Sequence, residues 1–136
     1  MGSQQIVLRQ LDKPRQKRLP EDVFWLCDSF GFSAGRDIEQ MASRIVLEVL
    51  QKHAEEQRIS SEQIADDLTV SHARVNHHLR NLIDSGLLYR EKRLIFLRGG
   101  SMKSAVQELR KDANRILDDL ERMAEEVDGA VGLKSR

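Results

Sequence analysis

Apolar side chains recur at helical spacing through the first part of the chain. A short helix is predicted from Pro20 to Phe30, because proline suits the first turn of a helix. Its apolar positions are Val23, Phe24, Cys27 and Phe30. Gly31 and residues 33–35 interrupt the pattern, and a longer amphipathic helix is predicted over residues 38–56. The apolar face of this second helix consists of Ile38, Met41, Ile45, Val46, Val49 and Leu50.

Two further helices are predicted from their capping residues. Ser60 and Gln63 form a capping box, in which the serine side chain accepts a hydrogen bond from the amide of Gln63. This helix is predicted to end at Thr69-Val70. Ser71 is a favourable N-cap for the next helix, which is predicted to run to Ser85, with Gly86 in the C′ position.

The pattern changes to strand character after Gly86. The apolar runs 87–89 and 94–97 predict two strands, and the polar residues 90–93 between them predict a tight hairpin. Gly99-Gly100 ends the sheet, and Ser101 caps a final helix. Helix, three-residue turn, helix and hairpin, in that order, make up a winged helix-turn-helix. The predicted fold class is therefore mainly α with a small β-hairpin, followed by a long C-terminal dimerisation helix.

The final helix has the most regular apolar pattern in the chain. Apolar residues recur at alternating spacings of four and three, along a length of about 39 Å at 1.5 Å per residue. They are Met102, Val106, Leu109, Ala113, Ile116, Leu120, Met123 and Val127. Such a stripe requires a partner surface, for which we favour a second copy of the chain over the helix at 38–50. Parallel, antiparallel and multi-helix arrangements remain open, because acidic g positions face few cationic e positions.

These elements divide the chain into four parts. Residues 1–19 form a basic, polar extension, 20–100 the winged helix-turn-helix domain, 101–128 the dimerisation helix and 129–136 a tail. The basic run Lys13–Arg18 has two open interpretations, an arm that reaches a minor groove or a solvated tail.

Composition excludes several classes of protein. With 40% apolar, 32% charged and only 4% aromatic residues, the chain favours helices over an all-β sandwich. It has no apolar run of membrane-spanning length and no secretory segment, so we expect a cytoplasmic protein without a membrane partner. Its single cysteine cannot form an internal disulfide. Because a phosphate loop, a nucleophile elbow and paired carboxylates in an apolar setting are all missing, an enzyme is not expected.

Charge is distributed unevenly although the net charge is zero. Residues 71–111 contain nine Lys/Arg against three Asp/Glu, whereas residues 37–70 contain three against eight. The basic stretch coincides with the predicted second helix of the helix-turn-helix and the hairpin. This coincidence indicates double-stranded DNA as a partner.

Helical geometry separates the residues of the predicted helix 71–85 into two faces. With Val75 directed to the core, Leu79, Leu82 and Ile83 lie on the same side. The opposite side near the helix start is small or hydrogen-bonding, which suits base edges in a major groove. The predicted base contacts are Ala73, Arg74, Asn76 and His77. The predicted DNA-backbone contacts are Ser71, Arg80, Arg90, Lys92 and Arg93, although the hairpin cations are also compatible with ordinary solvated charges.

Residues 64–88 carry a family resemblance. The pattern consists of Ile64-Ala65, Leu68, Ser71, Val75, His77-His78-Leu79, Leu82 and Gly86-Leu87-Leu88. It resembles that of the ArsR-like winged-helix transcription regulators, most strongly over residues 59–98. The long C-terminal helix is also similar to that of archaeal regulators of this superfamily. The resemblance implies a dimer that inserts two recognition helices into successive major grooves.

The chain departs from the metal-sensing members of that family. Their thiol pair is missing, since the only cysteine is Cys27, and the last helix lacks the histidine of their C-terminal site. His72, His77 and His78 are close in sequence, but they point in different directions and lack a completing ligand. We therefore expect no metal and no cofactor, and a buried thiol at Cys27. The sequence does not identify a small-molecule effector.

The function predicted from these features is sequence-specific transcriptional regulation. The protein would be a repressor that binds an inverted-repeat operator as a homodimer and occludes promoter DNA. Two alternatives are a winged-helix scaffold that binds proteins through its acidic coiled coil, and a non-specific nucleoid-type DNA-binding protein. The basic stretch at 71–98 argues against the scaffold, and the ratio of specific to non-specific affinity separates the other two.

Overall fold

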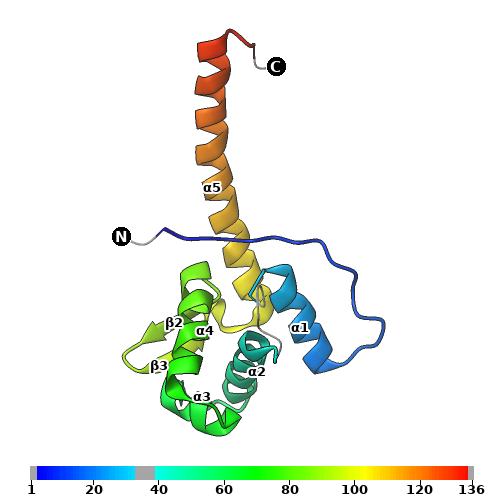
Figure 1. The fold of residues 1–136 in the computed structure, drawn as a ribbon, viewed down its shortest axis with the longest axis vertical. Helices are drawn as coiled ribbons and strands as arrows, with labels where there is room; N and C mark the ends of the chain where they lie inside the picture. The colour runs from blue at the N-terminus through cyan, green and yellow to red at the C-terminus, as the bar shows by residue number, and fades with distance from the viewer. Residues whose placement is uncertain (1–2, 33–38, 135–136) are drawn as a thin grey trace.

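The computed structural model describes residues 3–32 and 39–134. A helical body carries a small sheet on one side, and the last helix projects from it (Figure 1). The elements, in chain order, are α1 (Leu19–Ser29), α2 (Met41–Ala54), β1 (Ile59–Ser60), α3 (Ser61–Leu68), α4 (His72–Ser85), β2 (Leu88–Glu91), β3 (Leu94–Leu97), a 3₁₀ turn η1 (Arg98–Gly100) and α5 (Met102–Val131). The fold class is that of a winged helix-turn-helix with a long C-terminal helix, as predicted.

Serine side chains begin three of the helices as the sequence predicts. The hydroxyl oxygens of Ser60, Ser71 and Ser101 each accept a hydrogen bond from the amide three residues later, at 3.1 to 3.2 Å. Each cap satisfies an amide that has no partner within its own helix. Helix α4 ends at Gly86, whose φ of 94° lies in the left-handed region that glycine adopts without strain. The predicted limits of α3 and α4 are confirmed.

The predicted limits of α1, α2 and α5 differ from those of the structure. Helix α1 is shifted by one residue, and helix α2 ends at Ala54, two residues before the predicted end at Glu56. Helix α2 begins at Met41, after Gln40 in a left-handed conformation with φ of 54°, and Ile38 lies outside the described residues, as does the 33–35 interruption. Helix α5 continues through Gly129 to Val131, so the first residues of the predicted tail are helical. The helix ends at Gly132, where φ of 83° lies in the left-handed region that glycine favours.

The sheet has three strands, one more than predicted. Its order is β1-β3-β2, and both pairs are antiparallel. Strand β1 contains only two residues, too few for an alternating pattern to be visible in the sequence. Strand β2 extends through Glu91, so the hairpin turn is Lys92-Arg93 rather than the whole 90–93 segment. Arg90 consequently lies in the strand, opposite Ile95, and not at the tip.

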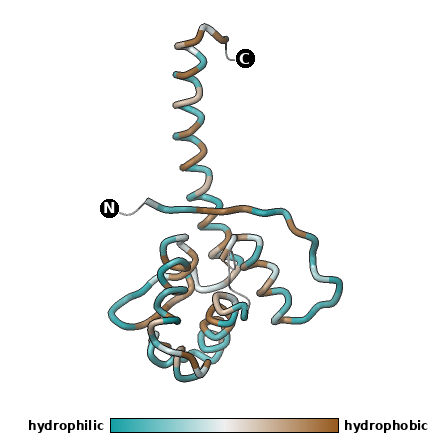
Figure 2. Tube along the Cα trace, viewed as in Figure 1, coloured by the Kyte–Doolittle hydropathy of each residue, from teal (hydrophilic) through white to brown (hydrophobic). Residues whose placement is uncertain are grey.

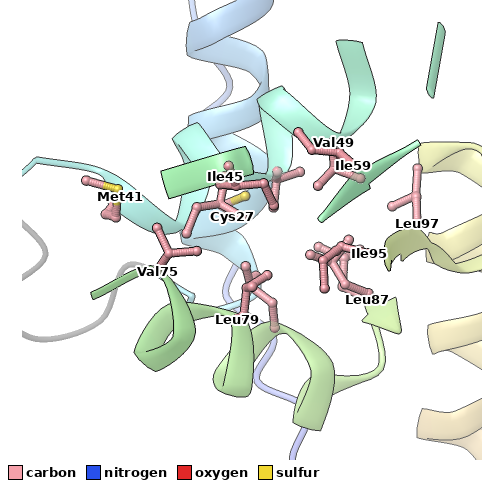
Figure 3. Packing of buried hydrophobic residues seen from close by; sticks show 14 of the residues in the cluster. Cys27, Met41, Ile45, Val49, Ile59, Val75, Leu79, Leu87, Ile95 and Leu97 are labelled. Atoms are coloured by element: carbon pink, nitrogen blue, oxygen red, sulfur yellow. The ribbon is translucent and has the colours of Figure 1, made fainter. Parts of the chain in front are cut away.

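The core lies between α2, α4 and the sheet, with α1 closing one end (Figure 3). Val75, Leu79 and Leu82 of α4 are fully buried, which confirms the predicted inward face of that helix. Cys27 is also fully buried, as predicted. Burial of this face fixes the rotation of α4 about its axis and thereby decides which of its residues face outward.

The N-terminal extension runs across the body instead of hanging free (Figure 1). Ile6 packs against the core, and the amide of Arg9 donates to the carbonyl of Ser29 at 2.7 Å. The indole Nε1 of Trp25 donates to the carbonyl of Leu11 at 3.2 Å. Apolar and hydrogen-bonding contacts therefore hold Ile6, Arg9 and Leu11 to the body.

A polar cluster fixes the direction in which α5 leaves the body. The buried carboxylate of Asp112 accepts from Arg98, from Gln4 Nε2 at 2.7 Å and from Arg115 at 3.3 Å. Gln4 also donates to the carbonyl of Ser85 at 3.0 Å, so the cluster joins the N-terminal extension, the end of α4, η1 and α5. These hydrogen bonds, chiefly the one from Arg98, lower the pKa of Asp112 from its ordinary value of 3.8 to about 2.

The apolar stripe of α5 divides into two parts. Leu109 is 2% exposed and belongs to the core, with Ala105 beside it, and Met102 packs against the same core. From Leu117 onward the apolar side chains are exposed, and the helix projects beyond the body (Figure 2). Leu109 is therefore not available for the intermolecular seam in which the sequence places it. Within the described ranges, no helix has the length and apolarity to cross a membrane.

Candidate nucleic-acid interface

Helices α3 and α4 form a helix-turn-helix. They are separated by residues 69–71, and Thr69 begins the turn in a left-handed conformation with φ of 56°. The amide of Val70 donates to the carbonyl of Ala65 at 3.0 Å, and its side chain packs against the core. The turn is thus held from both sides, and it presents the N-terminal end of α4 at the surface.

All four predicted base-contacting residues lie on the exposed side of α4. Ala73, Arg74, Asn76 and His77 are exposed, whereas Val75 between them is fully buried. Arg80, about one turn beyond Asn76, is exposed on the same helix. The predicted outward orientation is correct, and the assignment of these residues to bases or phosphates stays a prediction.

Arg74 has an intramolecular partner that the sequence did not indicate. One of its guanidinium nitrogens lies 2.8 Å from a carboxylate oxygen of Glu39, and both side chains are partly exposed. Exposed pairs of this kind contribute about 0.2–1 kcal/mol. A bidentate contact to guanine is worth about 1–3 kcal/mol of discrimination, so it can replace the Glu39 contact. Glu39 lies 35 positions from Arg74, beyond the reach of any local pattern.

The hairpin forms the wing, and its first strand lies against the recognition helix. The guanidinium of Arg90 donates to Asn76 Oδ1 at 3.5 Å, which joins β2 to the exposed side of α4. Tyr89 stacks on Phe96 across the hairpin, with ring centroids 5.2 Å apart. Lys92 and Arg93 are exposed at the tip. The wing therefore presents two cations at its end and one beside the helix.

Ser71 already has a structural role as the N-cap of α4. Its hydroxyl oxygen accepts from the amide of Arg74 at 3.2 Å, which leaves the hydroxyl hydrogen as a donor. A phosphate at the N-terminus of α4 would be favoured by that hydrogen, the first amides and the helix dipole. The predicted phosphate contact is thus compatible with the cap.

The basic charge of residues 71–111 is spread over two surfaces. Five of its nine cations lie on α4 or the wing, namely Arg74, Arg80, Arg90, Lys92 and Arg93. Arg98 is bound to Asp112, and its pKa is raised by that carboxylate. Lys103, Arg110 and Lys111 belong to α5. Only part of the charge that indicated DNA in the sequence is therefore on the recognition surface.

The basic run Lys13–Arg18 does not join this surface. It lies in the loop that leads into α1, on the side of the body opposite the wing (Figure 1). Contacts of Arg9 and Leu11 with α1 hold the preceding residues on that side. The minor-groove arm is thus disfavoured for the DNA that α4 would contact.

The three neighbouring histidines do not converge on one point. His77 is exposed and His78 is half-buried, and their ring centroids are 5.3 Å apart. Nε2 of His72 lies 3.9 Å from Oδ1 of Asp66. Among the described residues, no group of three or more His, Cys, Asp or Glu side chains is arranged to hold a metal ion.

A comparison with protein families identifies the same part of the chain. Residues 43–89 match the model of a family described as winged helix-turn-helix DNA-binding, from α2 to the second residue of β2. Neither the curated proteins nor the solved structures gave a match. The match does not extend to α1 or α5, and the narrower resemblance to ArsR-like regulators stays a prediction. Fold and family match together indicate that residues 43–89 form a DNA-binding winged helix-turn-helix.

Proposed function

We propose that the protein is a sequence-specific transcriptional regulator that binds an inverted-repeat operator as a homodimer. The observation that carries this proposal is the exposed N-terminal side of α4 beside the wing. It combines hydrogen-bonding side chains with five cations on one surface. Such a surface suits a major groove flanked by phosphates.

Base recognition is assigned to the first two turns of α4. Ala73 permits close approach, Asn76 offers the donor and acceptor pair that adenine requires, and Arg74 suits guanine. In this proposal Arg74 leaves Glu39 when DNA binds. Arg80 and the wing cations contact phosphates, which supply affinity but no sequence information.

Two copies are proposed to pair through α5. The exposed apolar stripe on the outer half of that helix requires a cover, and a second copy provides an identical one. A symmetric dimer presents two recognition helices to half-sites that are separated by about 34–36 Å or by a multiple of that distance. Repression then follows from occlusion of promoter DNA by the bound dimer.

A gel-shift titration at several salt concentrations tests DNA binding. The protein is mixed with genomic fragments selected by its own binding and with random duplexes. Arg74→Ala combined with Arg80→Ala should weaken binding to the selected fragments at least 10-fold and reduce the salt slope by about 1, because only Arg80 is assigned to a phosphate. The matched control, Lys13→Ala with Lys17→Ala, removes two cations from the α1 side and should change the affinity less than 2-fold.

The result also separates the two alternatives. A scaffold would bind duplex DNA without a salt slope, or would bind equally well after loss of Arg74 and Arg80. A nucleoid-type protein would bind selected and random DNA within a few-fold of each other, whereas specific regulators typically prefer their sites by about 10³ or more. Either outcome would contradict the proposed function.

A further inference from the structure

The outer half of α5 exposes a continuous apolar stripe. Its large side chains are between 54% and 67% exposed, namely Leu117, Leu120, Met123, Val127 and Val131. The helix projects beyond the body at this point (Figure 2). An isolated helix with this stripe in water would be poorly stable, so the stripe indicates a surface that binds a partner.

A groove lies at the other end of the same helix. It has a volume of about 390 Å³ and lies between α1 and the first turns of α5. Its lining residues are Leu26, Met102, Lys103, Val106, Gln107 and Arg110. Val106 and Ala124 are five helical turns apart and therefore point in the same direction. The groove thus continues the line of the stripe along one side of α5.

Charge along one edge of the stripe changes sign from the base of α5 to its tip. Lys103 and Glu121 are five turns apart, as are Arg110 and Asp128, so all four lie along the same edge. Glu125 lies next to Glu121 and Asp128 at the tip. The edge is therefore basic beside the groove and acidic beside the exposed stripe.

This polarity distinguishes the two ways in which identical helices can pair. In an antiparallel pair, the same edges of both helices meet. The basic N-terminal end of each α5 then faces the acidic C-terminal end of the other. In a parallel pair, opposite edges meet at equal height, which brings Glu121 and Glu125 near Asp119 and Glu126 of the second copy. Opposite charges attract in the first case, and like charges repel in the second. The acidic residues on the other edge near the base, Glu108 and Asp112, are already paired with Arg98 of their own protomer.

We propose that α5 pairs with a second copy in antiparallel orientation, with each tip seated in the groove between α1 and α5 of its partner. The inference rests on the dimer of the proposed function and adds its geometry. Full overlap of Met102–Val131 places the midpoint between Ile116 and Leu117. The two winged helix-turn-helix bodies then lie at opposite ends of the paired helices, with a twofold axis perpendicular to them.

Distance measurement by pulsed electron paramagnetic resonance tests the orientation. A spin label is attached through Gly129→Cys, because a side chain added at this position meets no atom within 4 Å. The unsubstituted protein controls for labelling at the buried Cys27. Antiparallel overlap predicts backbones about 38 Å apart at residue 129, whereas a parallel pair predicts about 15 Å, because residue 129 lies on the side of the helix away from the stripe.

The outcomes separate this inference from the proposed dimer. A distance distribution centred near 38 Å supports antiparallel pairing. A dimer by light scattering with a label distance below about 30 Å overturns the pairing while leaving the dimer intact. A monomer by light scattering overturns both, and DNA binding is then still tested by the gel shift.

Charge reversal provides a second test with opposite signs for the two orientations. Glu121→Lys with Glu125→Lys should weaken an antiparallel dimer at least 10-fold in sedimentation equilibrium, and would tighten a parallel one. Mixing this variant with Lys103→Glu/Arg110→Glu should restore affinity, because each tip again faces a base of opposite charge. Arg122→Glu, on the side of the helix that faces away from the stripe, is the control and should change the dissociation constant less than 3-fold. All five residues are exposed, so the fold is retained. A tighter dimer after tip reversal, or no restoration on mixing, would overturn the proposal.

Discussion

Helices α4 and α5 are both amphipathic, but they leave opposite faces exposed. In α4 the apolar side is covered by α2, α3 and the sheet, with Val75, Leu79 and Leu82 fully buried, and the polar side remains at the surface. In α5 the apolar side is covered only near its base, where Leu109 is buried, whereas Leu120 is 59% exposed. A polar exposed face selects a partner by hydrogen bonds and charge, as DNA requires. An apolar exposed face selects a partner that excludes water, as a second helix does.

Leucine truncation should give the largest difference between the two helices. Leu79→Ala in α4 removes a fully buried side chain and should lower the free energy of unfolding by about 2–5 kcal/mol at every protein concentration. Leu120→Ala in α5 should have little effect on the protomer and act through association, so its cost should depend on protein concentration. Denaturant unfolding at several concentrations measures both. A loss from Leu120→Ala that is independent of concentration would contradict the comparison.

Replacement of each exposed asparagine of α4 by alanine should show which of them contacts DNA bases. Asn76→Ala is expected to cost about 1–3 kcal/mol of binding to selected DNA and to leave binding to random DNA nearly unchanged. Asn81→Ala removes another exposed asparagine further along the same helix and is the matched control. Competition binding with both kinds of duplex gives the two affinities. Equal losses on selected and random DNA would assign Asn76 to the phosphates instead.

Low pH should weaken the Asp112 cluster, which joins the end of α4 to α5, and thereby lower the stability of the fold. The pKa of Asp112 is lowered to about 2 in the folded protein, so its ionised form stabilises the fold above the ordinary value of 3.8. This contribution, up to about 2 kcal/mol, is lost as pH falls from about 4 to 2. Thermal unfolding across that range should show a smaller acid dependence in Asp112→Asn than in the unsubstituted protein. The same slope in both proteins would rule out Asp112 as its source.

Removal of Glu39 should have the smallest effect. Glu39→Gln frees Arg74 from an exposed ion pair, which is worth about 0.2–1 kcal/mol, so DNA affinity should rise by no more than about 5-fold. Glu21→Gln removes an equal charge from α1, away from the wing, and controls for the general change in charge. Gel shifts at one salt concentration are sufficient for this comparison. A fall in affinity would show that Glu39 positions Arg74 for DNA.

The predictability of the recognition surface differed from residue to residue. The outward position of Asn76 and His77 followed from the inward position of Val75, because helical geometry relates neighbours by fixed rotations. The place of Arg90 did not follow, since the limit of β2 depends on pairing with β3. For the N-terminal extension, a polar sequence concealed the contacts of Ile6 and Gln4 with the body.

Interactions between residues three or four positions apart were determined by the sequence itself. The serine caps, the end of α4 at Gly86 and the division of α4 into two faces belong to this class, because neighbours along the helix supply both partners. Tertiary structure alone decided the contacts between distant residues. The two-residue strand β1, the Glu39–Arg74 pair and the hydrogen bond that joins Gln4 to Asp112 over 108 positions exist only when the chain is folded. The heptads of α5 belong to both classes, since periodicity determined which side of the helix is apolar, whereas packing against the body decided how much of that side remains exposed.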